Sequence, residues 1–141
     1  MFKNILVAVD GSENSDMAFE TAVELAKNSS SRLNVLHVAQ SSMGRKTMVS
    51  PQMNDTLMDI ARTIISSYKK KLEVNEKDLL KTKTLLKRGD AAQRIIETAR
   101  AEKCDLVVID SRGLGTFKQL LLGSVSQKVS NYTDCPVLIV R

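Results

Sequence analysis

The sequence is poor in the residues that build catalytic and metal-binding centres. Its 141 residues include one histidine, His37, two cysteines, Cys104 and Cys135, and no tryptophan. A single histidine excludes a two-histidine site within one chain, and without a CxxC pair or a His/Cys cluster we expect no structural zinc. Two isolated cysteines make no disulfide framework, so we expect both to be buried thiols in a reducing compartment.

Long apolar runs and strong charge are also missing. No run approaches the roughly 20 apolar residues that span a bilayer, and the start of the chain lacks the features of a signal peptide. The net charge is +5, and the aromatic residues are two tyrosines and three phenylalanines. Nucleic-acid surfaces interleave basic and aromatic residues, and this sequence contains no such array. We therefore expect a cytoplasmic protein that binds neither membrane nor nucleic acid.

The sequence does contain a regular alternation of apolar runs and amphipathic stretches. Short, β-branched apolar runs predict strands at 3–10, 32–39, 81–89, 104–110 and 135–140. Helical spacing of apolar residues predicts helices at 15–30, 55–73, 90–102 and 124–133. This alternation is typical of an α/β fold, a three-layer sandwich with a parallel sheet between helices, here as one domain over residues 1–141.

The first half of the chain allows more detailed expectations. Ser12 or Ser15 is expected to cap the first helix. Residues 40–54 are polar and are expected to form a long loop. The second helix is expected to turn one apolar stripe to the core, made of Leu57, Ile60, Ala61, Ile64 and Tyr68.

Polar residues in the second half predict an edge strand and two helix starts. The run 81–89 carries three lysines and one arginine, and lysine suits an edge because it blocks further pairing. Asp90 with Gln93, and Ser124 with Gln127, have the spacing of a capping box.

Two glycine-containing corners follow strands that we expect to lie side by side. Open parallel sheets bind ligands at the carboxyl ends of their strands, where the strand order reverses. If the first and fourth strands are neighbours there, Asp10-Gly11-Ser12 faces the segment 110–115 across a crevice. Asp10 could bind ribose or metal, or it could cap the turn. His37, at the end of the second strand, is expected to be a packed or hydrogen-bonded strand residue.

The second corner suits a phosphate. Gly113 and Gly115 allow close approach of the backbone or a positive φ, and Arg112 could add positive charge. The stretch is neither a P-loop nor a dinucleotide fingerprint, because it lacks GxxxxGK[ST] and the third glycine. From spacing alone, glycines that only make turns before the last helix are an equal alternative.

The start of the last helix is the other candidate phosphate contact. Gly123 and Ser124 open that helix, and the free N–H groups of Val125 and Ser126 would point toward the crevice at the positive end of the helix dipole. The Ser124 hydroxyl could cap the helix or bind phosphate, but not do both well.

The whole chain resembles the universal stress protein family. The stretch ILVAVDGSENSDMAFETAVELA resembles its N-terminal signature, GDAAQRIIETARAEKCDLVVID its central segment, and CPVLIV its final strand. The nucleotide motif of the family is glycine, two residues, glycine, nine residues, then Gly-Ser or Gly-Thr. Gly113, Gly123 and Ser124 match this motif in register, whereas Asp110 stands where the first glycine belongs.

The resemblance implies a fold, a ligand and a site. The fold is a five-stranded parallel sheet of order 3-2-1-4-5, of the adenine nucleotide alpha hydrolase-like kind. The ligand is ATP, or AMP or another adenylate, bound with Mg²⁺ or Mn²⁺. By position, Asp10 and Val38 would lie near the adenine and ribose. The phosphates would be surrounded by Gly113, Gly123, Ser124 and Val125. The expected site also includes Ala8, Asp110, Arg112, Gly115 and Ser126, and its expected metal ligands are Asp10 and Asp110.

Asp110 raises the question of whether the nucleotide still binds. A carboxylate about 4 Å from a phosphate could cost up to about 4 kcal/mol at an effective dielectric near 20. A divalent ion between them would reverse the sign, since hard cations accept oxygens from both. Alternatively, the side chain turns to solvent, pairs with Arg112 or a lysine, or caps the following turn. We expect a site that survives, with weaker or more metal-dependent binding of ATP.

The family role implied is stress response and signalling through nucleotide occupancy and an unidentified protein partner. A nucleotide-free interaction module of the same fold is the alternative. A weak ATPase is a third possibility, for which the sequence offers no evident nucleophile–base pair.

The last strand, 135–140, is wholly apolar and is expected at a sheet edge, where exposure would promote aggregation. We therefore expect a homodimer in which Val137–Val140 pairs with its own copy across a two-fold axis.

Overall fold

Five strands form one parallel sheet in the order β3-β2-β1-β4-β5, which confirms the predicted order. The computed structural model describes residues 1–40, 50–79, 81–111 and 123–141. Across these residues the strands are β1 Asn4–Ala8, β2 Arg32–Gln40, β3 Lys81–Gly89, β4 Leu106–Asp110 and β5 Val137–Val140. The helices are α1 Glu13–Ser29, α2 Pro51–Val74, α3 Ala91–Ala101 and α4 Ser124–Tyr132, with a short 3-10 turn at Glu76–Asp78.

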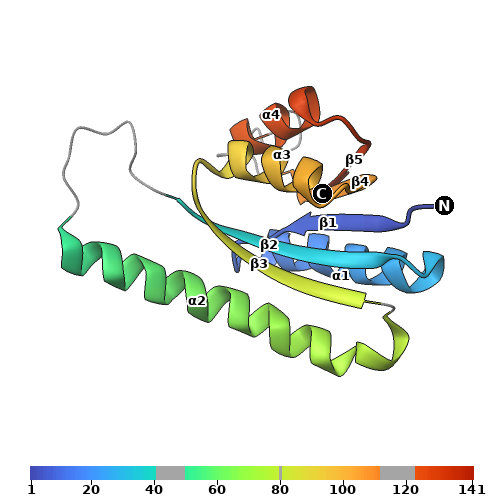
Figure 1. Ribbon diagram of the computed structural model, residues 1–141, viewed down its shortest axis with the longest axis horizontal. Helices are drawn as coiled ribbons and strands as arrows, with labels where there is room; N and C mark the ends of the chain where they lie inside the picture. Colours follow the sequence, from blue (N-terminus) through green and yellow to red (C-terminus); the bar gives the residue numbers. More distant parts are fainter. Residues whose placement is uncertain (41–49, 80, 112–122) are drawn as a thin grey trace.

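Helices cover both faces of the sheet, so the fold is the predicted three-layer sandwich. Figure 1 shows α1 and α2 on one face and α3 and α4 on the other. Alternate side chains of the central strands enter two cores, because successive residues of a strand point to opposite faces. Ile5 and Val7 of β1 lie in the core under α1 and α2, whereas Leu6 and Ala8 lie in the core under α3 and α4.

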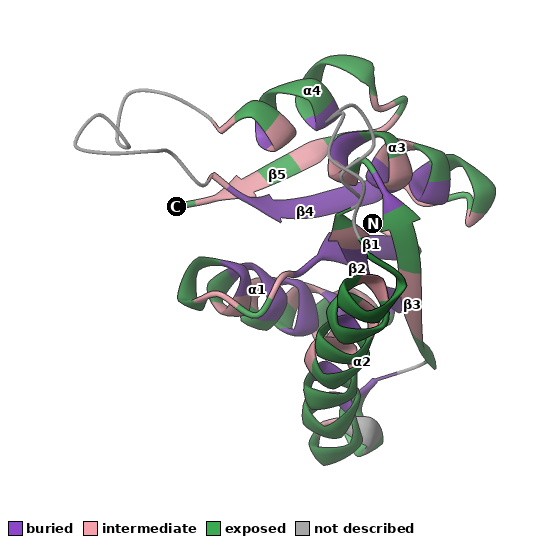
Figure 2. Ribbon diagram, turned by 90° about the vertical axis from the view of Figure 1, so that its left-hand side faces the viewer, coloured by how far each residue is buried: buried purple, intermediate pink, exposed green. Residues whose placement is uncertain are grey.

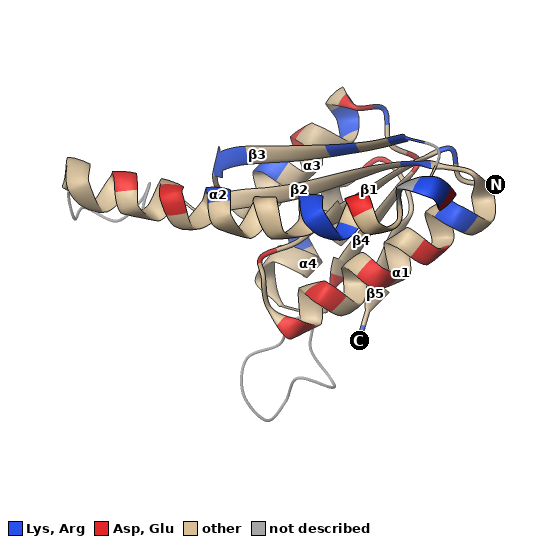
Figure 3. Ribbon diagram, turned by 90° about the horizontal axis from the view of Figure 1, so that it is seen from below, with Lys and Arg blue, Asp and Glu red and all other residues tan. Residues whose placement is uncertain are grey.

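The position of each strand explains its sequence. β4 lies inside the sheet and is buried along its whole length, as its apolar sequence requires (Figure 2). β3 lies at one edge, and Figure 3 shows its lysine and arginine residues along that edge, as predicted. β5 lies at the other edge and is only partly buried, with Leu138 37% exposed.

α2 begins four residues earlier than the sequence analysis predicts. Residues 51–54 are helical rather than part of the loop 40–54. The reason is local: the Oγ of Ser50 accepts a hydrogen bond from the N–H of Met53 at 3.2 Å, and Pro51 occupies the first helical turn. Proline is tolerated there because that N–H has no partner within a helix. Residues 41–49, the rest of the predicted loop, lie outside the described residues.

The predicted apolar stripe of α2 is only half correct. Ala61 and Tyr68 are buried, and Ile64 packs against the same core. Leu57 and Ile60 are 44% and 53% exposed, so their prediction as core residues is wrong. Figure 1 shows the physical reason, since the first turns of α2 extend past the ends of the strands.

The capping box predicted at α3 forms only in part. The carboxylate of Asp90 accepts the N–H of Gln93 at 2.9 Å, as predicted. The side chain of Gln93 does not turn back to Asp90, because its Nε2 donates to Glu97 Oε1 at 3.0 Å.

The two cysteines are free thiols, as expected, but they are half-buried rather than fully buried. Burial, with a smaller contribution from the neighbouring Cys135, raises the pKa of Cys104 to about 12. Burial also raises the pKa of Cys135. Both thiols therefore stay protonated at neutral pH and are poor nucleophiles.

No helix among the described residues has the length and apolar character needed to cross a bilayer.

Candidate functional site

The strand order reverses between β1 and β4, where the sequence analysis predicts the ligand. β1 is followed along the chain by β2 on one side, and β4 pairs with β1 on its other side. The carboxyl ends of β1 and β4 therefore open side by side between the two helical layers. We call this region the switch point, made of residues 10–12 after β1, the end of β4 at 110–111, and 123–126 at the start of α4.

The first wall of the switch point is a turn that its own polar side chains hold. Asp10 Oδ1 accepts the N–H of Ser12 at 3.0 Å, so Asp10 caps the turn. Between them Gly11 has a φ of +84°, a conformation that a side chain would disfavour. Ser12 then caps α1 by accepting the N–H of Ser15 at 3.2 Å. Of the two predicted caps of α1, Ser12 is the correct one.

The second wall joins the end of β4 to the start of α4. The Oγ of Ser126 donates to the carbonyl of Asp110 at 2.5 Å, and the N–H of Gly123 donates to the carbonyl of Ser111 at 3.1 Å. These two bonds fix the first turn of α4 beside the end of β4. The Ser126 hydroxyl is therefore used within the protein, which leaves its N–H as the group that could meet a ligand.

The predicted cap of α4 is wrong. Gly123, and not Ser124, is the N-cap residue, and among the described residues no side chain caps this helix. Ser124 is the first helical residue and is exposed. The side chain of an N-cap residue accepts a hydrogen bond from the N–H two or three residues further along the chain. A serine one position later, inside the helix, cannot do this. Of the two uses foreseen for the Ser124 hydroxyl, only ligand binding remains.

Asp110 is the last residue of β4 and is 8% exposed. Its side chain does not turn to solvent, which removes one of the alternatives foreseen for it. Arg112, Gly113 and Gly115 lie outside the described residues, so the glycine half of the predicted phosphate loop carries no structural statement.

The two helix starts at the switch point differ in charge. The first turn of α1 carries Glu13 and Asp16, while the first turn of α4 carries no acidic residue. Figure 3 shows the acidic residues along α1. Carboxylates already neutralise the positive end of the α1 dipole, so an anionic ligand meets less repulsion at α4.

Apolar strand ends complete the surroundings. Ala8 is 8% and Val38 is 9% exposed, and both belong to the core under α3 and α4. His37 is buried with its Nδ1 2.8 Å from the carbonyl of Val9, which confirms the expectation of a hydrogen-bonded strand residue. The expected contacts of Ala8 and Val38 with a base stay predictions.

The metal expectation rests on two carboxylates only. Among the described residues no three histidine, cysteine, aspartate or glutamate side chains gather in one place. Asp10 follows β1 and Asp110 ends the neighbouring strand β4, and carboxylate oxygens are ligands that Mg²⁺ prefers. The donor set therefore fits an ion that takes its other ligands from water and phosphate, and it does not fit a cage built by protein alone.

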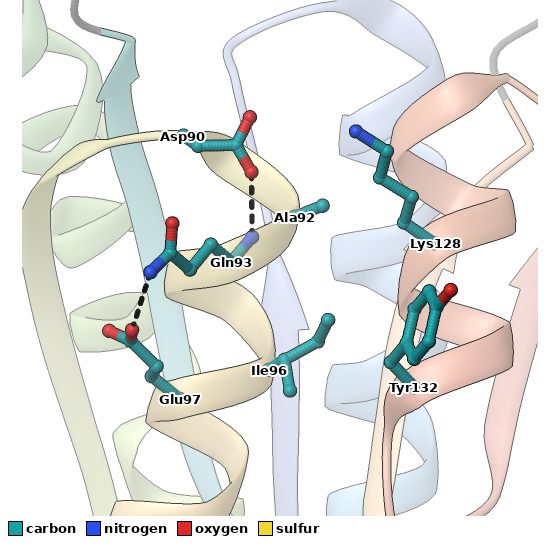
Figure 4. A pocket seen from close by; sticks show the side chains of 7 residues that line it. All are labelled: Asp90, Ala92, Gln93, Ile96, Glu97, Lys128 and Tyr132. Atoms are coloured by element: carbon teal, nitrogen blue, oxygen red, sulfur yellow. Dashed lines mark hydrogen bonds between the residues drawn. The ribbon is translucent and has the colours of Figure 1, made fainter. Parts of the chain in front are cut away.

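A shallow hollow on the outer surface between α3 and α4 is a feature that the sequence analysis misses. Figure 4 shows the side chains that line it, which are Asp90, Ala92, Gln93, Ile96, Glu97, Lys128 and Tyr132. Its carboxylates are already engaged, Asp90 as a helix cap and Glu97 with Arg94 and Gln93. These bonds, that of Arg94 first, lower the pKa of Glu97. The two carboxylates of the hollow therefore have structural partners in α3 and its cap.

Two buried residues behind the first wall were also missed as site residues. Ser15 and Tyr68 are fully buried, and their side-chain oxygens lie 3.0 Å apart. The sequence predicts Tyr68 as a core residue, but no local signal joins residues that stand 53 positions apart.

The comparisons with known proteins agree with this geometry. A family model described as the universal stress protein family matches residues 1–141. Universal stress protein YxiE of Bacillus subtilis is 35% identical over 153 residues, and the match covers 100% of both chains. A universal stress protein of Thermus aquaticus is 35% identical over 150 residues, again with 100% of both chains covered.

Solved structures of similar fold include three informative ones. Universal stress protein UspA from Lactobacillus plantarum has a TM-score of 0.76 at 23% identity, covering 99% of this chain and 97% of that chain. A universal stress protein in complex with cAMP has a TM-score of 0.76 at 22% identity with the same coverage. One from Archaeoglobus fulgidus in complex with dAMP has a TM-score of 0.65 at 21% identity, covering 99% of this chain and 98% of that chain. At these identities the likeness shows the fold alone.

Proposed function

This chain belongs to the universal stress protein family, and from that premise we propose that it binds an adenine nucleotide at the switch point. The nucleotide would act as a signal, and its presence or absence would be read by a protein partner. The observation that carries the proposal is the start of α4, whose first turn lacks acidic residues and is held against the end of β4.

The phosphates fit best at the start of α4. The N–H groups of Ser124, Val125 and Ser126 lie in the first turn of α4. They have no acceptor within the helix, because no earlier helical turn precedes them. Their dipole favours an anion, and the exposed Ser124 hydroxyl adds a donor. The neighbouring start of α1 is disfavoured because Glu13 and Asp16 would repel phosphate.

The adenine moiety is supported by chemistry and by analogy. Two proteins of the same fold are complexes with cAMP and with dAMP, which share the adenine base and one phosphate. In this chain Ala8 ends β1 and Val38 lies near the end of the neighbouring strand β2, and these apolar residues would accept the flat base. A divalent ion bound with ATP would be held by Asp10 and Asp110 and would screen their charge from the phosphates.

Calorimetry with AMP, cAMP and ATP, with and without Mg²⁺, tests the proposal. We expect the native chain to bind at least one adenylate at millimolar concentrations or below. Ser124→Asp would place a carboxylate at the phosphate position and should weaken binding about tenfold or more. The control is Ser130→Asp, which adds the same charge to an exposed position near the other end of α4.

Two results would contradict the proposal in different ways. If the native chain binds no adenylate at millimolar concentrations, the nucleotide-free interaction module is the better description. If the native chain binds but Ser124→Asp and Ser130→Asp bind equally well, the phosphates do not lie at α4. Radiolabelled ATP, incubated with the native chain, separately tests the weak ATPase that the sequence analysis left open.

A further inference from the structure

α2 contacts the first wall of the switch point through two residues that lie about one turn apart. A Cβ placed on Gly11 would lie 3.6 Å from the side chain of Ile64, so the turn rests on that side chain. Tyr68 is fully buried, and its hydroxyl lies 3.0 Å from Ser15 Oγ and 2.5 Å from Asp16 Oδ1. The phenol of α2 therefore reaches the residues that shape the turn after β1.

Ser15 is the link between that phenol and the turn. Its Oγ accepts the N–H of Asp10 at 3.1 Å and lies 3.1 Å from the carbonyl of Ser12, to which it can donate. Its own N–H donates to Ser12 Oγ at 3.2 Å. One buried hydroxyl thus contacts both ends of the segment 10–12, and its position sets the shape of that segment.

Counting protons gives these bonds a direction. The carboxylate of Asp16 can only accept, so the Tyr68 hydroxyl donates its single proton to Asp16. The Tyr68 oxygen is then an acceptor, and the single proton of Ser15 is shared between it and the Ser12 carbonyl. At the Asp16 end of this series of hydrogen bonds, Lys71 Nζ lies 3.4 Å from Asp16 Oδ1. The bonds run from the Asp10 N–H through Ser15 and Tyr68 to Asp16.

The phenol keeps its proton under all ordinary conditions. Burial first, and then the hydrogen bond to Asp16, together raise the pKa of Tyr68 to about 12. The ring is held by packing independent of the hydroxyl, since its centroid lies 5.1 Å from that of Phe19 and 4.9 Å from Lys71 Nζ.

We propose that Tyr68 is a positioning residue of the nucleotide site, which acts through Ser15 to hold Asp10 and the turn 10–12 in the shape that receives the ligand. The inference rests on the proposed function. It assigns to α2, on the far side of α1 from the second wall, a part in setting nucleotide affinity.

Tyr68→Phe is the direct test, because it removes only the hydroxyl and leaves the ring packing. We expect Tyr68→Phe to bind AMP about three- to tenfold more weakly than the native chain does, which is the size of one lost hydrogen bond. Ser15→Ala should weaken binding at least as much. The double variant should weaken it by less than the product of the two single effects, because the two groups act as one unit.

Leu72→Ala is the matched control. Leu72 lies one turn further along α2, is 4% exposed and makes no bond to the turn 10–12. This variant should lower the melting temperature at least as much as Tyr68→Phe and leave AMP affinity unchanged. A loss of affinity in Leu72→Ala equal to that in Tyr68→Phe would mean that general destabilisation is responsible, and the inference would be wrong.

A measurement without nucleotide separates this inference from the proposed function. Amide hydrogen exchange at Asp10 should become faster in Tyr68→Phe and Ser15→Ala but not in Leu72→Ala. Unchanged exchange and unchanged AMP affinity in Tyr68→Phe would overturn the positioning role while leaving the proposed function intact. If the native chain binds no adenylate, the proposed function fails first, and the role of Tyr68 in nucleotide binding fails with it.

Discussion

Asp110 is the residue at which this chain departs from the nucleotide motif of its family. A glycine there would be neutral and flexible, whereas Asp110 is a buried acid at the last position of β4. Aspartate is compatible with a strand end, so the backbone itself imposes no penalty. The charge is the larger effect, because repulsion from a phosphate and attraction to a bridging cation have opposite signs.

Replacing this carboxylate tests the effect of its charge. Asp110→Asn keeps the shape and removes the charge, so ATP should bind more tightly without Mg²⁺ and should gain less from added Mg²⁺ than in the native chain. Asp110→Gly, which restores the motif, should change the Mg²⁺ dependence in the same direction. Calorimetric titrations with and without Mg²⁺ measure both. An identical Mg²⁺ effect in all three proteins would show that Asp110 has no part in binding.

At the scale of single elements, the helix starts show where sequence patterns succeed. The spacing of Asp90 and Gln93 predicts the start of α3, and the cap at Asp90 forms. The same spacing at Ser124 and Gln127 predicts a cap that does not form, because Gly123 is the N-cap residue of α4 and Ser124 is already its first helical residue. A capping pattern gives the approximate place of a helix start, but the path of the preceding chain decides which residue occupies the cap.

The half-formed box at α3 leads to a prediction about stability. Asp90→Ala should lower the free energy of unfolding by about 1 kcal/mol, since it removes the cap. Gln93→Ala should cost less than about 0.5 kcal/mol, because Gln93 only pairs with Glu97 along the helix. Urea unfolding of both variants measures the difference. Equal losses would indicate that the reciprocal bond from Gln93 to Asp90 forms in solution.

At the scale of the whole molecule, the two sheet edges differ. β3 carries lysines that discourage pairing, whereas β5 is apolar and half-buried along Val137–Val140. We propose that β5 pairs with its own copy across a two-fold axis, because an apolar open edge would otherwise favour aggregation. The carbonyls of Pro136 and Val140 already bond to β4, and by alternation the outward groups are those of Val137 and Ile139.

The edge proposal is tested by the oligomeric state. The native chain should sediment as a dimer at micromolar concentration. Leu138→Lys, which puts two like charges near the centre of such a pair, should shift it toward monomer. Leu57→Lys is the matched control, since Leu57 is comparably exposed but lies on α2, and it should stay dimeric. A native chain that sediments only as monomer would contradict the proposal.

The helices and strands and their order can be predicted from the sequence alone. Strand and helix patterns depend on residues within one segment, and β-α alternation with right-handed crossovers leaves few topologies. The switch point at Asp10–Ser12 and β4 followed from the same reasoning, and the resemblance to the family led to the proposed ligand class.

Features that depend on contacts between distant segments became visible in the folded structure. The exposure of Leu57 and Ile60 follows from how far α2 extends beyond the sheet, which no local period reports. The use of the Ser126 hydroxyl on Asp110, and the bond between Ser15 and Tyr68, join residues 16 and 53 positions apart. Such bonds form because packing of the helices on the sheet brings the groups together, so their partners cannot be found within either segment alone.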